Sequence, residues 1–400
     1  MDAICPSAPQ AQAPSGILES TAQAPVPVPI PTAPQAPEPS SPGSQRSRQT
    51  HINIFKFLVV FFFPILYNDI RNISYSGKQN FPFDRKRLFF SAKGYEHMAG
   101  LFFDDYDTPV FRPPSEADSF ILRVTRGCAH NSCTYCNMYR GVKFEKLSDE
   151  QIMRQIAIAY SVDRDGVRRV FLADGDALVL PTERLLKILN TLKKYFPNLE
   201  RVSSYAAPGD ILRKSLDELK QLREAGLQLL YYGMESGDSQ TLKDIRKGVN
   251  GEQSIEVGKR VRAAGMDLSI MIILGIAGVP GSERHALATA HAINEIKPTH
   301  LSALSLMLYR GSELKDQFER GEFTPLPPYG LMEELKVIVE HLDLPETEHM
   351  IFRSNHVSNY IRLAATLPRD KEKLLADIDE SIRYLKSKKN YDVYNHDWTK

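Results

Sequence analysis

The chain has 400 residues, 42% of them hydrophobic and 25% charged, which is a composition typical of soluble globular proteins. Its 50 Lys and Arg residues nearly balance its 49 Asp and Glu residues, so neither nucleic acid nor a membrane surface is indicated as a partner. Three of the four cysteines lie within a nine-residue segment, which favours a metal site over a disulfide framework. We therefore expect a reducing compartment, the cytoplasm.

Residues 1–50 predict a disordered tail. Prolines spaced among Ala, Gln and Ser remove backbone donors and leave too little apolar side chain to offset chain entropy. Cys5 lies in this tail and has no evident partner. Residues 51–108 form an extension of uncertain structure with an apolar run at 57–67. That run contains a proline and is shorter than the roughly 20 residues of a membrane-spanning helix, so we expect no span there.

Residues 109–310 alternate short apolar runs with amphipathic segments. Capping boxes at Ser148–Gln151 and Ser215–Glu218 open two expected helices, and Gly226 ends the second. Buried strands separated by helices predict parallel βαβ units, in an α/β fold that is a partial, TIM-like (β/α)6 barrel or a doubly wound sheet. The expected strands are 120–125, 170–173, 202–205, 227–234, 268–274 and 301–306.

Unusual polar or glycine-rich segments follow four of these strands. In both candidate folds the chemistry lies at the C-terminal ends of the strands. We therefore expect these segments to meet at one mouth. They are the cysteine loop after the first strand, residues 174–176 after the second, residues 235–237 after the fourth and residues 275–278 after the fifth.

The cysteine loop is the most informative segment. The thiolates of Cys128, Cys133 and Cys136 are soft ligands suited to an iron–sulfur cluster or to zinc. Three cysteines can hold three irons of a cubane cluster and leave the fourth iron open, as catalysis at a metal requires. The spacing also permits a structural zinc site made of these cysteines and His130.

This Cys-x4-Cys-x2-Cys loop resembles the Cys-x3-Cys-x2-Cys motif of the radical S-adenosylmethionine superfamily, with one residue more in the first gap. The resemblance covers residues 118–306. It implies that Cys128, Cys133 and Cys136 bind a 4Fe–4S cluster whose open iron chelates S-adenosylmethionine. An electron from a flavodoxin- or ferredoxin-like reductant would split the cofactor into a 5′-deoxyadenosyl radical that abstracts hydrogen from a substrate. The sequence does not name that substrate.

The same resemblance implies a set of cofactor-binding residues. The segment that begins at Glu235 is similar to the branch containing methylthiotransferases and oxygen-independent coproporphyrinogen dehydrogenases. Arg246 is an alternative to Lys247 as the cation for the methionine carboxylate. The candidates are Tyr135 and Met138 beside the adenosyl group, Gly175 and Asp176 at the amino group, Ser204 on the third strand, Glu235 at the ribose, Lys247 at the carboxylate and Gly275 near the adenine.

Residues 311–400 predict a mainly helical extension with amphipathic helices at 331–342 and 371–385. The connector at 352–360 is dense in polar groups, which would suit a lid over the mouth or groups that cap helix ends. His130, Arg353 and His356 are the catalytic candidates.

Two further functions remain open from the sequence. One is a cluster-binding heme carrier related to coproporphyrinogen dehydrogenase, and the other is a zinc-stabilised scaffold protein. Because no cysteine follows Cys136, an auxiliary cluster is not expected.

Overall fold

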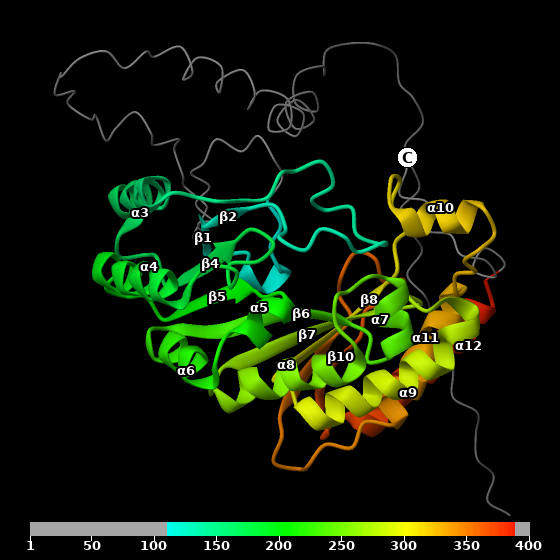
Figure 1. Cartoon of the computed structure of the whole chain (residues 1–400). Coiled ribbons are helices and arrows are strands. Elements are labelled where there is room, and N and C mark those ends of the chain that lie inside the picture. Colours follow the sequence, from blue (N-terminus) through cyan, green and yellow to red (C-terminus); the bar gives the residue numbers. More distant parts are fainter. Residues whose placement is uncertain (1–109, 389–400) are drawn as a thin grey trace, which may run out of the picture. The chain divides into compact units, whose positions relative to one another are not determined.

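The computed structural model describes residues 110–388 (Figure 1). These residues fall within one of the two compact units into which the chain divides, residues 91–400. The predictions for residues 1–50, for residues 51–108 and for Cys5 lie outside the described part. The proposed division into 109–310 and 311–400 stays a prediction.

An eight-stranded sheet organises this part of the chain, in the order β1-β4-β5-β6-β7-β8-β9-β10. Neighbouring strands from β1 to β9 run parallel, and β10 runs antiparallel to β9. The sheet is open, with β1 and β10 at its edges. Its strands are β1 (Phe120–Arg123), β4 (Arg169–Ala173), β5 (Arg201–Tyr205), β6 (Leu227–Glu235), β7 (Asp267–Leu274), β8 (His300–Ser305), β9 (Met350–Arg353) and β10 (Ala364–Leu367). A separate pair joins β2 (Thr125–Arg126) to β3 (Glu145–Lys146).

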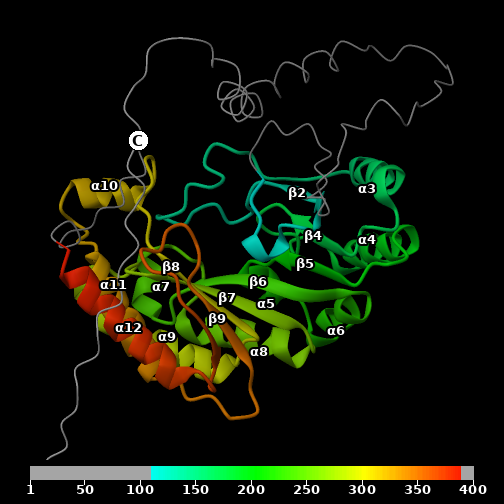
Figure 2. The same ribbon diagram turned by 180° about the vertical axis from the view of Figure 1, so that it is seen from behind.

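Helices cover the outer face of the curved sheet, as the views from the two sides show (Figures 1 and 2). The long helices are α3 (Asp149–Asp163), α4 (Thr182–Tyr195), α6 (Leu216–Glu224), α8 (Gly251–Ala263), α9 (Gly278–Ile296), α11 (Pro328–Glu340) and α12 (Lys371–Lys386). The short ones are η1 (Pro114–Glu116), α5 (Pro208–Arg213), α7 (Ser239–Asp244) and α10 (Glu313–Glu319). None of the helices between residues 110 and 388 has the length and apolar character needed to cross a membrane.

Local sequence signals explain most of these elements. The Ser148 and Ser215 side chains each accept a hydrogen bond from the backbone three residues on, and Gln151 and Glu218 return one, so both capping boxes are confirmed. Gly226 has φ +112°, which is the left-handed conformation expected at the end of α6. The apolar stripe of α4 is buried against the sheet, and strands β1 and β4 are buried on both faces.

The C-terminal region differs from the prediction of a mainly helical extension. Helices α11 and α12 lie within one to three residues of their expected bounds, but β9 adds a seventh parallel strand beside β8 and β10 reverses along it. These strands have four residues each, too few to show a period-two pattern in the sequence. Residues 352 and 353 of the expected connector therefore belong to the sheet, and the remainder joins β9 to β10.

Candidate active site

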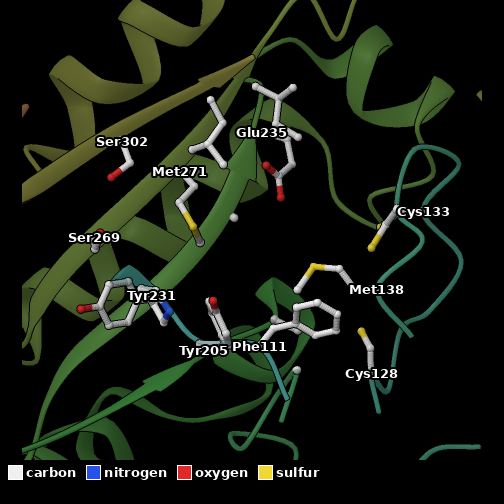
Figure 3. Close-up of a pocket in the computed structure, with 18 of the residues that line it drawn as sticks. Phe111, Cys128, Cys133, Met138, Tyr205, Tyr231, Glu235, Ser269, Met271 and Ser302 are labelled. Carbon is white, nitrogen blue, oxygen red and sulfur yellow. The ribbon is translucent and has the colours of Figure 1, made fainter. Parts of the chain in front are cut away.

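A cavity of about 1050 Å³ lies on the inner side of the sheet. Because side chains alternate between the faces of a strand, every second residue of β6, β7 and β8 faces it. Figure 3 shows side chains from several strands converging on this space. The inward-facing residues of these three strands are Leu229, Tyr231, Gly233, Glu235, Ser269, Met271, Ile273, His300, Ser302 and Leu304.

All three predicted cluster ligands line this cavity. Cys128, Cys133 and Cys136 are partly exposed and carry free thiols. Burial raises the pKa of each thiol, that of Cys136 to about 11, and neighbouring thiolates contribute to the rise at Cys136. The three sulfur atoms are thus close enough to interact electrostatically at one end of the cavity.

Asp174 fixes the start of the cysteine loop. Its Oδ2 atom accepts a hydrogen bond from the backbone N–H of Gly127 at 3.0 Å, and its carboxylate forms a fully buried ion pair with Arg123 at 3.2 Å. The N–H of Gly175 donates to the Gly127 carbonyl at 3.2 Å. A Cβ atom at Gly175 would lie 3.2 Å from the Cβ atom of Cys128, so only glycine lets β4 approach the loop this closely.

Three free thiols that line one cavity are a donor set that fits an iron–sulfur cluster. Among residues 110–388, no three His, Cys, Asp or Glu side chains are arranged around one point as a mononuclear site requires. In a cubane each thiolate binds a different iron, so the three sulfur atoms share a pocket without converging on one atom. His130 is not grouped with the thiols, because its Nε2 atom contacts the Arg246 carbonyl oxygen at 2.7 Å.

Glu235 and Lys247 form an ion pair in the wall of the same cavity. Glu235 Oε1 lies 2.9 Å from Lys247 Nζ, and their side chains are 9% and 12% exposed. Glu235 lines the cavity at a point where the β6–β7 register is irregular, and its φ is +65°. Burial acts to lower the pKa of Lys247, but the carboxylate of Glu235 and the charge of Cys133 outweigh it, so that pKa is raised. Lys247 therefore stays protonated.

Tyr135 lies beside this pair and also lines the cavity. Burial and then the Glu235 carboxylate raise the pKa of its phenol well above the ordinary range. The neutral phenol of Tyr135 and the ammonium of Lys247 are thus two donor groups near the Glu235 carboxylate.

Not every predicted cofactor-binding residue faces the cavity. Met138 and Gly175 line it, whereas Asp176, Ser204 and Gly275 do not. The Asp176 carboxyl is buried beside Asp210, and burial and this neighbour raise its pKa. The Ser204 hydroxyl donates to the carbonyls of Leu172 and Tyr205. Their roles toward the cofactor stay predictions, as do those of the residues that line the cavity.

All three catalytic candidates lie at the cavity, whereas the alternative carboxylate-binding cation does not. His130, Arg353 and His356 all line the cavity. The His356 Nδ1 atom accepts from the Ser358 backbone at 3.2 Å. Arg246, the alternative to Lys247, points elsewhere, since its guanidinium forms two 2.7 Å contacts with Glu313.

Sequence reasoning missed the inward-facing side chains of the strand interiors. Tyr205, Tyr231, Ser269, Met271 and Ser302 all line the cavity. Counting in steps of two back from Glu235 would have found Tyr231, because both share one face of β6. The Tyr231 hydroxyl donates to the buried carboxylate of Glu116 at 2.7 Å. The two residues are more than a hundred positions apart, so no local sequence pattern predicts this contact.

Helix α9 holds the segment that follows Glu235. The Ser236 hydroxyl lies 2.7 Å from His285 Nδ1, and the Gly237 N–H donates to Thr289 Oγ1 at 3.0 Å. Behind α9, the Glu334 carboxyl of α11 accepts from the Gly275 N–H at 2.6 Å and from Ser282 Oγ at 2.5 Å. The segment after Glu235 is thus anchored to α9 and Gly275 to α11, and Ser282 of α9 bonds to the same Glu334 carboxyl.

His285 Nε2 lies 3.6 Å from Glu334 Oε1, and both side chains are fully buried. Burial lowers the pKa of His285 to about 4 and raises the pKa of Glu334 to about 7. The imidazole is neutral at pH 7, so this contact is not an ion pair.

Residues 122–290 match the model of the radical SAM superfamily. A putative methylthiotransferase of Methanocaldococcus jannaschii is 24% identical over 37% of this chain and 33% of its own length. A tRNA-2-methylthio-N(6)-dimethylallyladenosine synthase of Dehalococcoides mccartyi is 30% identical over 42% and 40%, and the heme chaperone of Bacillus subtilis is 22% identical over 53% and 56%. The chain thus spans between 33% and 56% of the length of these relatives.

Solved structures with a similar arrangement include methylornithine synthase, with a TM-score of 0.40 and 14% identity over 69% of this chain and 82% of that chain. Another is a radical S-adenosylmethionine methyltransferase from Kitasatospora setae, solved with cobalamin and a 4Fe–4S cluster. It has a TM-score of 0.41 and 15% identity over 50% of this chain and 39% of that chain.

Proposed function

We propose, on the premise that residues 122–290 match the radical SAM superfamily, that this protein abstracts a hydrogen atom from a substrate held in the inner cavity. Cys128, Cys133 and Cys136 would hold the 4Fe–4S cluster. The observation that carries the proposal is that these thiols and the Glu235–Lys247 pair line one cavity large enough for a cofactor and a further small molecule.

A 4Fe–4S cluster held by Cys128, Cys133 and Cys136 would supply the electron that breaks the C–S bond of S-adenosylmethionine, giving methionine and a 5′-deoxyadenosyl radical that would take a hydrogen atom from the substrate. The residues of the chain position the cofactor for this step. The Lys247 ammonium is suited to bind a carboxylate, and Glu235 to bind an ammonium or a ribose hydroxyl. Both are nearly buried, so water competes weakly for them.

The strand walls separate the reacting atoms from solvent. Met271, Ile273 and Leu304 line the cavity between the cysteine end and the polar end. Apolar side chains exclude water from the site. The reductant that supplies the electron is of the flavodoxin or ferredoxin kind, in a reducing compartment such as the cytoplasm.

Anaerobic reconstitution of the full chain with iron and sulfide tests this function. After addition of dithionite and S-adenosylmethionine, we expect 5′-deoxyadenosine from the natural chain, none from Cys133→Ala, and the natural amount from Cys5→Ala, which removes a cysteine outside the loop. Zinc bound without acid-labile sulfide would contradict the proposal and favour a zinc-stabilised scaffold.

A heme carrier is the second candidate, favoured by the match to the Bacillus subtilis heme chaperone over 53% of this chain. The same reconstituted protein distinguishes the two functions. A loaded and reducible cluster without any 5′-deoxyadenosine, together with a Soret band that shifts when hemin is added, would support the carrier.

A further inference from the structure

The cavity extends beyond the part that the cofactor would occupy. In Figure 3, Cys128 and Cys133 lie at one end and the side chains of Ser269 and Tyr231 lie at the other. If the proposed function holds, the cofactor takes the cysteine end beside Glu235, so the opposite end receives the substrate. The side chains at that end therefore indicate the chemical class of the substrate.

Strand register brings four polar side chains to this end. Arg353 of β9 is paired with Ser302 of β8, and His300 is paired in turn with Ser269 of β7. All four line the cavity. Because neighbouring strands are about 4.8 Å apart, a small ligand can contact several of these side chains at once.

Three other arginines in the cavity wall, Arg169, Arg201 and Arg213, already have acidic partners, and that of Arg213 is Asp210. Arg201 Nη2 lies 2.8 Å from the Glu116 carboxylate, which is fully buried, and Arg169 pairs with Asp118 at 3.6 Å. Glu116 is further occupied by the hydroxyl of Tyr231. These carboxylates are therefore not available to neutralise another cation.

Arg353 has a different environment. Its Nη1 atom donates to the backbone carbonyls of Phe352 at 2.7 Å and Ala365 at 3.3 Å. Within residues 110–388 it forms no ion pair with an acidic side chain. A guanidinium carries five N–H donors, so this one keeps a full positive charge and unused donors at the cavity.

His300 experiences this charge. Burial lowers its pKa, the exposed Asp267 acts to raise it, and the charges of Arg201 and Arg353 lower it further. The imidazole is therefore neutral at pH 7. His300 lies two residues before Ser302, the strand partner of Arg353, on the same face of β8, so its imidazole and the guanidinium can bind the same ligand.

We propose that the substrate carries an oxyanion, a carboxylate or a phosphate, and that Arg353 binds it with Ser302 and His300 at the end of the cavity away from the cysteines. The planar guanidinium matches the two oxygens of either group. Binding there holds the rest of the substrate toward the cysteine end, where the hydrogen atom is removed.

The test uses the full chain without S-adenosylmethionine, so its result does not depend on cofactor cleavage. Phenylglyoxal, which modifies arginine side chains, is added at fixed ionic strength with inorganic phosphate, with acetate or with chloride alone. Mass spectrometry follows modification of Arg353 and of Arg362, which is exposed like Arg353 but lies in the segment between β9 and β10 and does not line the cavity. Phosphate affinity is measured in parallel by calorimetry for the natural chain, Arg353→Gln and Arg362→Gln.

We expect phosphate or acetate to slow the modification of Arg353 but not that of Arg362. Loss of one charge-assisted contact predicts an affinity about tenfold weaker in Arg353→Gln and unchanged in Arg362→Gln. Protection by only one anion would narrow the class to that group. Equal affinity in both variants, or no protection of Arg353 by either anion, would overturn the inference while leaving the cleavage experiment unaffected.

Discussion

Asp174 Oδ2 and the backbone nitrogen of Gly127 are 3.0 Å apart, and this hydrogen bond joins the end of β4 to the residue before Cys128, the first predicted cluster ligand. The same carboxylate faces the Arg123 guanidinium at 3.2 Å, with both side chains fully buried. One charged group thus connects the geometry of the cysteine loop to the interior of the sheet.

Substitution of Asp174 by Asn keeps the shape and removes the charge. It leaves the Arg123 guanidinium buried without this anionic partner, so we expect the free energy of unfolding to fall by about 3–5 kcal/mol. Iron content after reconstitution should fall as well, because the loop loses its anchor. Urea unfolding and iron analysis measure the two effects.

Glu295→Gln is the matched control, since it also neutralises a carboxylate in an ion pair. Its pair with Lys259 lies at the surface, with side chains 44% and 47% exposed, and should contribute little to stability because solvent screens it. Equal destabilisation by both substitutions would contradict the anchoring role of Asp174.

Gly175→Ala should displace the cysteine loop, because the added methyl group would press against it. The added Cβ atom would lie 3.0 Å from Tyr139 Cε2 and 3.1 Å from the Gly127 carbonyl oxygen. Overpacking of this kind costs about 1–3 kcal/mol. We expect a lower melting temperature and less iron bound per chain. In Gly209→Ala the nearest atom is the end of the Arg213 side chain at 3.5 Å, so neither quantity should fall.

Lys247→Met tests whether the ion pair in the cavity binds the cofactor. Loss of a nearly buried ammonium predicts an affinity for S-adenosylhomocysteine at least about tenfold weaker, measured by equilibrium dialysis on reconstituted protein. Arg246→Met removes the adjacent cation, which pairs with Glu313 outside the cavity, and should leave the affinity unchanged. An equal loss of affinity in both variants would contradict a direct contact of Lys247 with the cofactor and would indicate a structural role.

The local sequence contained enough to predict the parallel sheet, its helix caps and the cysteine loop. Each of these depends on residues within a few positions of one another, such as the reciprocal bonds of Ser148 and Gln151. Lys247 was named as a candidate only through resemblance, because nothing local distinguishes it from Arg246, and its role stays a prediction. The structure separates the two by their partners, Glu235 and Glu313.

The positions that could not be predicted from the sequence are set by strand register and by contacts between residues far apart in the chain. The inward position of Ser302 follows from its pairing with Met271 and Arg353, which lie on strands far apart in the chain. Gly275 was expected at the cofactor, yet its N–H bonds to Glu334 on α11 and it does not line the cavity. A helix that begins some fifty residues later decides where that glycine lies.

Glu334 and His285 predict an unusual dependence of stability on pH. The pKa of Glu334 is raised by burial to about 7, so its contribution to stability is complete below its ordinary value of 4.5 and is lost as pH rises toward 7. The pKa of His285 is lowered to about 4, so its contribution is complete above 6.5 and is lost as pH falls toward 4. Between pH 4.5 and 6.5 the two slopes oppose each other.

Substituting one group at a time should reveal how that group changes the free energy of unfolding with pH, by about 1.4 kcal/mol per pH unit. Relative to the natural chain, Glu334→Gln should gain stability as pH rises from 4.5 to 7, because the natural chain alone loses the carboxyl contribution. His285→Gln should gain stability as pH falls from 6.5 to 4. Urea midpoints across this range measure both differences. Glu333→Gln, whose carboxylate pairs with Lys386 at the surface, should show neither. Parallel curves for all three variants would mean that the buried pair does not titrate in the folded protein.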